Sequence, residues 1–177
     1  MRPKRIPTLH TIGHSRRSLE ELIQPLRRHE TALLADVRTA PRSRRVPQFN
    51  RESLVEALPA AGIEYRHIPE LGGFRKPRPD SLNSAWRNAS FRGYADHMQT
   101  PEFQAALEEL LAVAADLRTA IMCAEALPYR CHRSLIADAV TARRLTVEHI
   151  IDSWRTERHR LTRFAVVEGE RISYPSE

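Results

Sequence analysis

The chain has few cysteines, almost no lysine and no long apolar run. Its 177 residues include two cysteines, too few for the disulfide framework that stabilises small secreted domains. No apolar stretch approaches the roughly 20 residues of a membrane-spanning helix. The basic residues 1–5 are not followed by the apolar core of a secretory signal. These absences predict a cytoplasmic protein with reduced thiols and no membrane partner.

The positive charge comes almost entirely from arginine. Lys4 and Lys76 are the only lysines among 28 basic residues, and with 22 acidic residues the formal net charge is +6. Such a balance favours an anionic small molecule or a nucleic acid as the partner. An excess of Arg, Ala and Leu over Lys is also typical of GC-rich coding, so the charge alone leaves the partner open.

Apolar runs typical of strands alternate with segments whose apolar residues recur at helical spacing. The predicted strands are residues 8–12, 32–37, 63–68, 119–122 and 147–151, and the predicted helices are 19–26, 51–61, 100–117 and 131–144. Residues 71–92 predict a long loop, and residues 164–174 predict a β-hairpin. The order predicts one three-layer α/β domain over residues 1–177, with a mostly parallel sheet of about five strands and helices on both faces. Its core is expected at about 8–152, with a C-terminal extension at 153–177.

Each predicted strand leads into residues that can bind or react. Because ligands of open α/β sheets bind beyond the carboxyl ends of the strands, these residues are expected at one shared site. In chain order they are His14 and Ser15, Asp36 and Arg38, Gly72 and Gly73, Cys123 and Glu125, and His149. Taken singly, each has an ordinary structural explanation, such as helix capping or local ion pairing. Their recurrence at strand ends is what predicts a site.

Both cysteines lie within residues 123–133. Cys131 stands at the predicted start of a helix, where free amides and Arg133 would lower a thiol pKa. Cys131 is therefore a candidate thiolate, and Cys123 a candidate nucleophile with Glu125 or His132 as base. The alternative is that Cys123 is an inert, buried, apolar side chain. A zinc site built from Cys123, Cys131 and a histidine such as His132 is a further alternative.

Two familiar motifs nearly fit this stretch and fail. A phosphatase loop places arginine six residues after its cysteine, but position 129 is tyrosine. A zinc deaminase needs a distant second motif with two more cysteines, and only Cys131 follows Cys123.

A second basic cluster follows the predicted second strand. It comprises Arg38, Arg42, Arg44 and Arg45, with Ser43 among them. Arginine binds phosphate or carboxylate oxygens in a bidentate manner, so the cluster predicts a clamp, although a solvated loop would look similar. The expected anion-binding set is Ser15, Arg38, Arg42, Ser43, Gly72, Gly73 and Arg133.

In several motifs the chain resembles the family named domain of unknown function 488, a group of uncharacterised bacterial and archaeal α/β proteins. The resembling segments are 11–15, 36–38, 41–43, 49–50, 71–73, 93–94, 122–125 and 131–133, together with Tyr65. The resemblance implies an α/β fold whose motif residues gather in one cleft. It implies no reaction, although members are sometimes labelled as related to DNA repair.

The residues predict an enzyme that acts on an anionic, phosphate-bearing or nucleic-acid-derived substrate. Its chemistry would be carried by His14, Asp36, Cys123, Glu125, Cys131 and His132. Two alternatives remain open: a protein that binds nucleic acid or a nucleotide without chemistry, and a thiol redox protein that uses Cys123 and Cys131. No cofactor is predicted beyond the zinc alternative.

Overall fold

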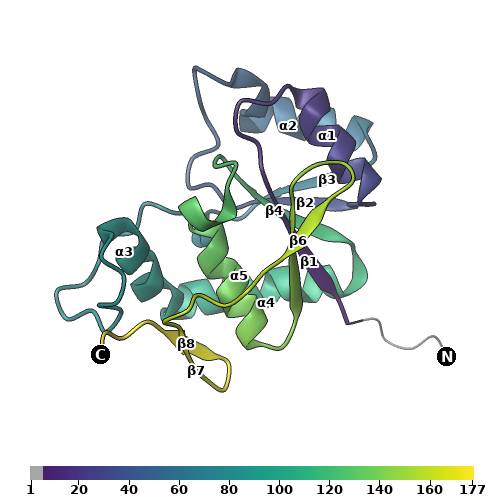
Figure 1. Ribbon diagram of the computed structural model, residues 1–177. Coiled ribbons are helices and arrows are strands. Elements are labelled where there is room, and N and C mark those ends of the chain that lie inside the picture. Colours follow the sequence, from purple (N-terminus) through teal and green to yellow (C-terminus); the bar gives the residue numbers. More distant parts are fainter. Residues whose placement is uncertain (1–5) are drawn as a thin grey trace.

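A six-stranded sheet forms the centre of the structure, a computed structural model that describes residues 6–177 (Figure 1). The basic residues 1–5, including Lys4, lie outside the described part. The strand order is β3-β2-β4-β1-β5-β6, and only β6 is antiparallel to its neighbour. The strands of the sheet are β1 (Thr8–Gly13), β2 (Leu33–Asp36), β3 (Glu64–His67), β4 (Thr119–Cys123), β5 (Thr146–Ile150) and β6 (Thr156–Arg158). A separate antiparallel hairpin consists of β7 (Val166–Glu168) and β8 (Arg171–Ser173).

Helices cover both faces of the sheet. They are α1 (Leu19–Arg28), α2 (Arg51–Ala60), α3 (Ala89–Met98), α4 (Pro101–Asp116) and α5 (Arg133–Ala142). Short 3-10 turns occur at η1 (Pro47–Phe49), η2 (Pro69–Leu71) and η3 (Pro128–Arg130). No helix in residues 6–177 is long and apolar enough to cross a membrane.

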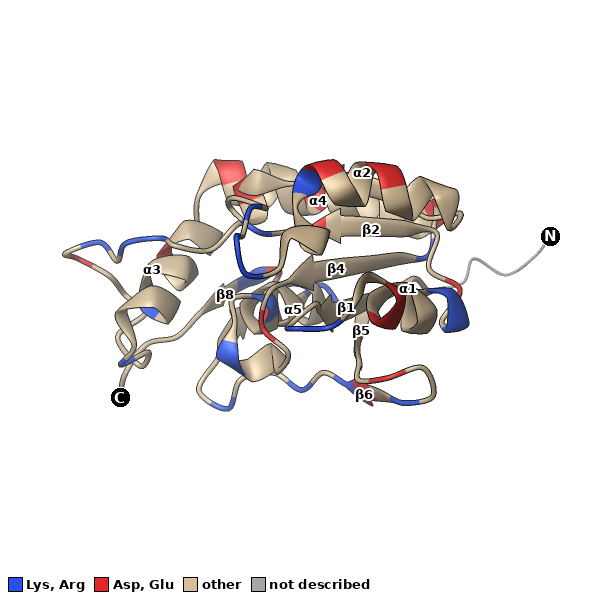
Figure 2. Cartoon of the chain, turned by 90° about the horizontal axis from the view of Figure 1, so that it is seen from above, with Lys and Arg blue, Asp and Glu red and all other residues tan. Residues whose placement is uncertain are grey.

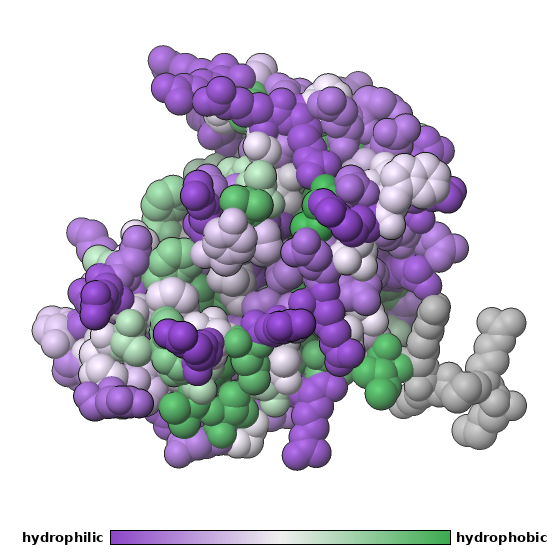
Figure 3. Space-filling model, viewed as in Figure 1, coloured by the Kyte–Doolittle hydropathy of each residue, from purple (hydrophilic) through white to green (hydrophobic). Residues whose placement is uncertain are grey.

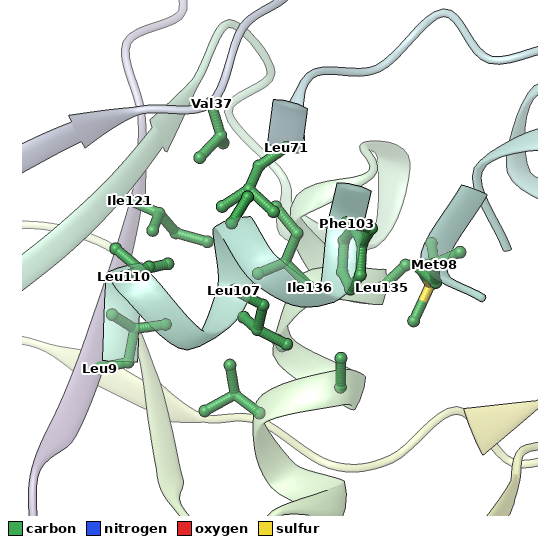
Figure 4. Close-up of a cluster of buried hydrophobic side chains, with 14 of the residues drawn as sticks. Leu9, Val37, Leu71, Met98, Phe103, Leu107, Leu110, Ile121, Leu135 and Ile136 are labelled. Atoms are coloured by element: carbon green, nitrogen blue, oxygen red, sulfur yellow. The ribbon is translucent and has the colours of Figure 1, made fainter. Parts of the chain in front are cut away.

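Side chains that alternate along the strands fill two separate apolar cores. Leu34 and Met122 belong to the core that is completed by α1 and α2. Ala35, Ile121 and Cys123 belong to the other core, which α3, α4 and α5 complete. Figure 4 shows this second core, where leucines of α4 and α5 pack against β-strand residues. Because both faces are covered, the central strands β2 and β4 are buried throughout and lie in nearly continuous apolar runs.

The chain leaves neighbouring strands toward opposite faces of the sheet. After β1 it passes through α1, and after β4 it passes through α5 on the other face. The two strands are adjacent, with Gly13 paired to Cys123. Diverging connections of this kind open a crevice at the carboxyl ends of the strands. Figure 2 shows the arrowheads of β2 and β4 pointing toward the end of the sheet where α3 lies, with basic residues on the loops there.

The structure confirms the predicted α/β class, the mostly parallel sheet and the C-terminal hairpin. It adds two elements that the sequence analysis did not predict. Helix α3 occupies residues assigned partly to a long loop, and β6 extends the sheet by one antiparallel strand. The predicted division into a core and a C-terminal extension stays a prediction.

Candidate functional site

A cleft of about 570 Å³ lies at the carboxyl ends of β1, β2 and β4, and we call it the thiol cleft. The residues predicted from the sequence that line it are His14, Arg38, Arg42, Ser43, Gly73, Cys123, Glu125, Cys131 and His132. In the space-filling view the surface is hollowed between the part that carries α1 and α2 and the part that carries α3 (Figure 3). The structure thus brings together most of the residues expected at one site.

Arg38 is fixed in the cleft wall by a buried carboxylate. Its Nε and Nη2 atoms donate to the two oxygens of Asp36 at 2.8 and 2.6 Å, and Nη2 also donates to the Phe49 carbonyl. Asp36 is fully buried and accepts further bonds from the Arg38 amide and the Tyr65 hydroxyl. With both oxygens engaged and no surface in the cleft, Asp36 positions Arg38 and is not placed to act as a base. This corrects its predicted catalytic role.

His14 is a neutral neighbour of Arg38. Its Nδ1 lies 2.8 Å from the carbonyl of Ser15, which can only accept, so Nδ1 carries the proton. The other ring nitrogen, Nε2, therefore accepts from Nη1 of Arg38 at 3.3 Å. Burial lowers the pKa of His14, although the bond to Ser15 opposes this. The ring stacks on Phe49 with centroids 4.4 Å apart, which fixes its plane.

The two thiols interact at the floor of the cleft. Hydrogen bonding from Cys131 lowers the pKa of Cys123, and the charge of Arg133 acts in the same direction against the effect of burial. Burial raises the pKa of Cys131 well above its ordinary value. This is opposite to the predicted lowering of the Cys131 pKa.

His132 presents an unprotonated nitrogen to Cys131. Its Nε2 donates to the carbonyl of Val37 at 2.7 Å, which leaves Nδ1 as an acceptor 3.7 Å from the Cys131 sulfur. Burial lowers the pKa of His132 to about 4. The ring is neutral near pH 7 and holds an added proton weakly.

The loop between β4 and α5 is held over β1. A side chain at Gly13 would place its Cβ 1.7 Å from the carbonyl oxygen of Glu125, so only glycine lets the loop cross here. The same loop is bonded to α5, because Nη2 of Arg133 donates to the carbonyls of Glu125 and Ala126 at 3.0 and 3.2 Å. Arg133 is only 1% exposed. It supports the loop and does not reach the cleft, which corrects its predicted role in binding an anion.

The start of α5 is not a free anion cradle. The amide of Arg133 donates to the Cys131 sulfur at 3.3 Å, and the amide of Ser134 donates to the Cys131 carbonyl at 3.1 Å. The amides of Gly73 and Ala124 have no acceptor within residues 6–177 and lie in residues that line the cleft. The unpaired backbone N–H groups at the cleft therefore belong to the loops and not to the start of α5.

Three further predicted residues lie away from the thiol cleft. Ser15 lines a separate surface hollow, and the amide of Gly72 is already bonded to the Pro69 carbonyl at 2.8 Å. His149, at the end of β5, lines a different cleft. The segments that follow β1, β2, β3 and β4 therefore each contribute to the thiol cleft, with Gly73 as the contribution after β3, whereas the predicted contribution of β5 does not reach it.

The basic cluster after β2 divides between the cleft and the solvent. Arg42 and Ser43 line the cleft, whereas Arg44 and Arg45 do not. Arg130, the last residue of η3, also lines the cleft. The guanidiniums of Arg42 and Arg130 are exposed and have no hydrogen-bond partner in the described chain. They are free to meet a ligand.

Several residues that line the cleft were not among the predicted site residues. They are Thr39, Phe74, Asn88, Ser90, Phe91, Tyr94 and Arg130. Four of these come from the start of α3, which had no clear helical pattern. For Arg130 the signal was present, since it precedes Cys131 directly in the sequence. Glu125 lines the cleft as predicted, but its carboxylate has no bonded partner within residues 6–177, and its backbone carbonyl is the group that contacts Cys123.

A metal site is not formed by the predicted ligands. Among residues 6–177 no three His, Cys, Asp or Glu side chains are grouped so that they could hold a metal ion. Cys123, Cys131 and His132 all line the thiol cleft, but their side chains are not grouped closely enough to ligate one ion. The arrangement fits a thiol pair beside cationic groups better than a zinc centre.

Comparison with known proteins gives a family without a reaction. The family model described as domain of unknown function DUF488 matches residues 18–140, which is more than half of the chain. Neither the search of curated proteins nor the search of solved structures found a match. The matched range includes Asp36, Cys123 and His132, while His14 precedes it. The chain belongs to the DUF488 family.

Proposed function

We propose that the protein is an enzyme that binds an anionic, phosphate-bearing substrate in the thiol cleft and uses Cys123 as its nucleophile. The observation that carries this proposal is the convergence of a thiol whose pKa is lowered with the free guanidiniums of Arg42 and Arg130 in one cleft. Both cysteines are free thiols, which supports action in a reducing compartment such as the cytoplasm.

The cleft combines a rigid cation with two adjustable ones. Arg38 is held by Asp36 and offers its remaining Nη1 hydrogen toward the cleft. Arg42 lies on a loop and Arg130 at the end of η3, and both side chains are exposed and can close on oxygens of different substrates. The unpaired amides of Gly73 and Ala124 add donors of the kind that stabilise developing negative charge.

The proposed reaction has two steps. The Cys123 thiolate attacks the electrophilic centre of the substrate, and the bond to the leaving group breaks with its electron pair. The Cys131 thiol gives its proton to the leaving group. Water then attacks the same centre, the bond to sulfur breaks, the electron pair returns to Cys123, and one water proton returns to Cys131. The raised pKa of Cys131 suits it to hold the proton between turnovers.

Alkylation with iodoacetate and with iodoacetamide tests the proposal, because the two reagents differ in charge and react alike. In each, sulfur bonds to carbon, the carbon–iodine bond breaks and iodide leaves. Cys123 should react before Cys131, as peptide mass spectrometry would show. Relative to the denatured chain, the folded protein should favour iodoacetate by about tenfold, the effect expected of two nearby cations.

Matched variants separate the cleft from general charge. Arg42→Gln with Arg130→Gln should abolish the preference for iodoacetate. Arg44→Gln with Arg45→Gln makes the same charge change on residues that do not line the cleft, and should leave the preference in place. If both pairs behave alike, the preference comes from net charge, and the proposal fails.

The contact between the two thiols also favours a second function, thiol–disulfide exchange. Cys123 would attack an oxidised glutathione molecule and release one glutathione thiol, and Cys131 would then attack the mixed disulfide and release the second. The product would be a Cys123–Cys131 disulfide. Its formation would lower the intact mass by two hydrogens. A stable mixed disulfide on Cys123, with no internal bridge, would reject this function.

A further inference from the structure

A second cleft of about 920 Å³ adjoins the thiol cleft. Its walls include Trp86, Tyr129, His149, Arg158 and Arg160. Six of the residues that line it, His149, residues 157–160 and Thr162, lie after residue 140, beyond the part of the chain that the family model matches. The C-terminal part of the chain therefore creates a surface that the matched region does not supply alone.

Residues that line the two clefts adjoin one another at two places. In η3, Tyr129 lines the second cleft and the next residue, Arg130, lines the thiol cleft. On the other side, Trp86 of the second cleft stacks on Phe91 of the thiol cleft, with ring centroids 4.8 Å apart. A ligand longer than either cleft can therefore pass across η3 from one to the other.

Exposed aromatic rings occur along this path. Phe74, in the thiol cleft, is 95% exposed, although its backbone has a φ of +58°, a conformation that favours glycine. Tyr129 is 66% exposed. The indole nitrogen of Trp86 is buried and has no acceptor in the described residues. Large rings left in solvent at the mouths of clefts are suited to stack on flat ligand groups.

Arginines accompany the rings. Arg42 and Arg130 in the thiol cleft and Arg158 and Arg160 in the second cleft are exposed, with no side-chain partner in residues 6–177. The carboxylates of Glu125 and Glu157 lie in the same two clefts, so the balance remains positive. Cations that follow a backbone, interleaved with rings that stack on bases, are what a single-stranded nucleic acid requires.

We infer that the two clefts form one binding track for a single-stranded nucleic acid, which crosses η3 at Tyr129 and Arg130. This inference rests on the proposed function and names its substrate as a strand longer than one nucleotide. Bases would stack on Phe74 and Tyr129, and phosphates would pair with the four arginines. The stretch of strand in the thiol cleft would lie beside Cys123.

Fluorescence anisotropy with a labelled oligothymidylate of about 12 nucleotides tests the track. One control is an abasic strand of the same length, which has the same phosphates but no bases. The other is a polyglutamate peptide of equal charge, which has neither phosphates nor bases. The oligothymidylate should bind more tightly than both. Its affinity should fall as salt rises from about 50 to 200 mM.

Variants test separately the contribution of base stacking and the contribution of phosphate contacts. Tyr129→Ala should weaken oligothymidylate binding by about tenfold, the size of one base–ring contact, and leave the abasic strand unaffected, whereas Tyr129→Phe should bind normally. Arg158→Gln with Arg160→Gln should reduce the salt slope by about 1.4, since each phosphate contact contributes about 0.7 in a single strand. The control pair Arg27→Gln with Arg171→Gln removes equal charge outside both clefts and should leave the slope unchanged.

Equal affinity for the oligothymidylate, the abasic strand and the peptide would overturn the track, as would normal binding by Tyr129→Ala. This outcome is distinct from failure of the proposed function, because iodoacetate probes only the thiol cleft. Charge-selective alkylation without strand binding would reject the track alone. Strand binding with no selective alkylation would reject the nucleophile and leave the track in place.

Discussion

Replacing Asp36 with asparagine should destabilise the protein strongly, because it leaves the Arg38 guanidinium buried without its counter-ion. The Asp36 side chain is fully buried and that of Arg38 is 11% exposed. Removing one partner of a buried ion pair costs about 3–5 kcal/mol. Asparagine keeps the shape and one accepting oxygen, but its NH₂ group would face Nη2 of Arg38, a second donor. We therefore expect a loss near the lower value, about 3 kcal/mol.

Urea unfolding monitored by circular dichroism measures this loss. The control is Tyr65→Phe, which removes one hydrogen bond to the same carboxylate, 2.7 Å long, at a half-buried position. It should cost about 1 kcal/mol. If Asp36→Asn costs no more than Tyr65→Phe, the ion pair does not hold Arg38 in place, and the description of the cleft wall is wrong.

Three further changes test other parts of the structure. Gly13→Ala should cost about 3 kcal/mol in urea unfolding, because its Cβ would collide with the Glu125 carbonyl. Stability should fall as the pH drops from 6.5 toward 4, since His132 takes up its proton in the unfolded chain before it does so in the folded one. In the His132→Gln variant, the free energy of unfolding should decrease by up to about 3 kcal/mol less between pH 7 and pH 4 than it does in the native chain. Asp138→Asn weakens bonds to His159 and Tyr174, so limited proteolysis should cut after residue 150 faster than in the native chain.

The centre of the sheet could be predicted because β2 and β4 lie in continuous apolar runs between helical segments. Residues 32–37 and 119–122 have this pattern since helices cover both faces of the sheet. Helix α3 escaped prediction for the opposite reason. It buries the polar residues Asp96 and His97 together with Gly93, so it has no clear apolar face. Asp96 is stabilised by donors from Ser81 and Asn83, which no local pattern reveals.

The meeting of strand ends was predictable, but the roles within the site depended on contacts between distant segments. Arg133 looked like an anion-binding residue because it stands at a helix start, yet the loop at Glu125 folds over it and uses its donors. The pKa of Cys131 was expected to fall, but its burial outweighs the helix start. The folded positions of the loops decide which charged side chains keep unpaired hydrogen-bond donors, and a sequence pattern does not give those positions.

Protection of Cys123 by inorganic pyrophosphate tests the central claim most directly. Neutral iodoacetamide reports access to the thiol, and an anion that occupies the thiol cleft should block it. Pyrophosphate should slow the alkylation of Cys123 in a saturable way, chloride at equal ionic strength should not, and Arg42→Gln with Arg130→Gln should remove the protection. If pyrophosphate protects Cys123 no better than chloride does, the thiol cleft is not an anion site and the account is contradicted.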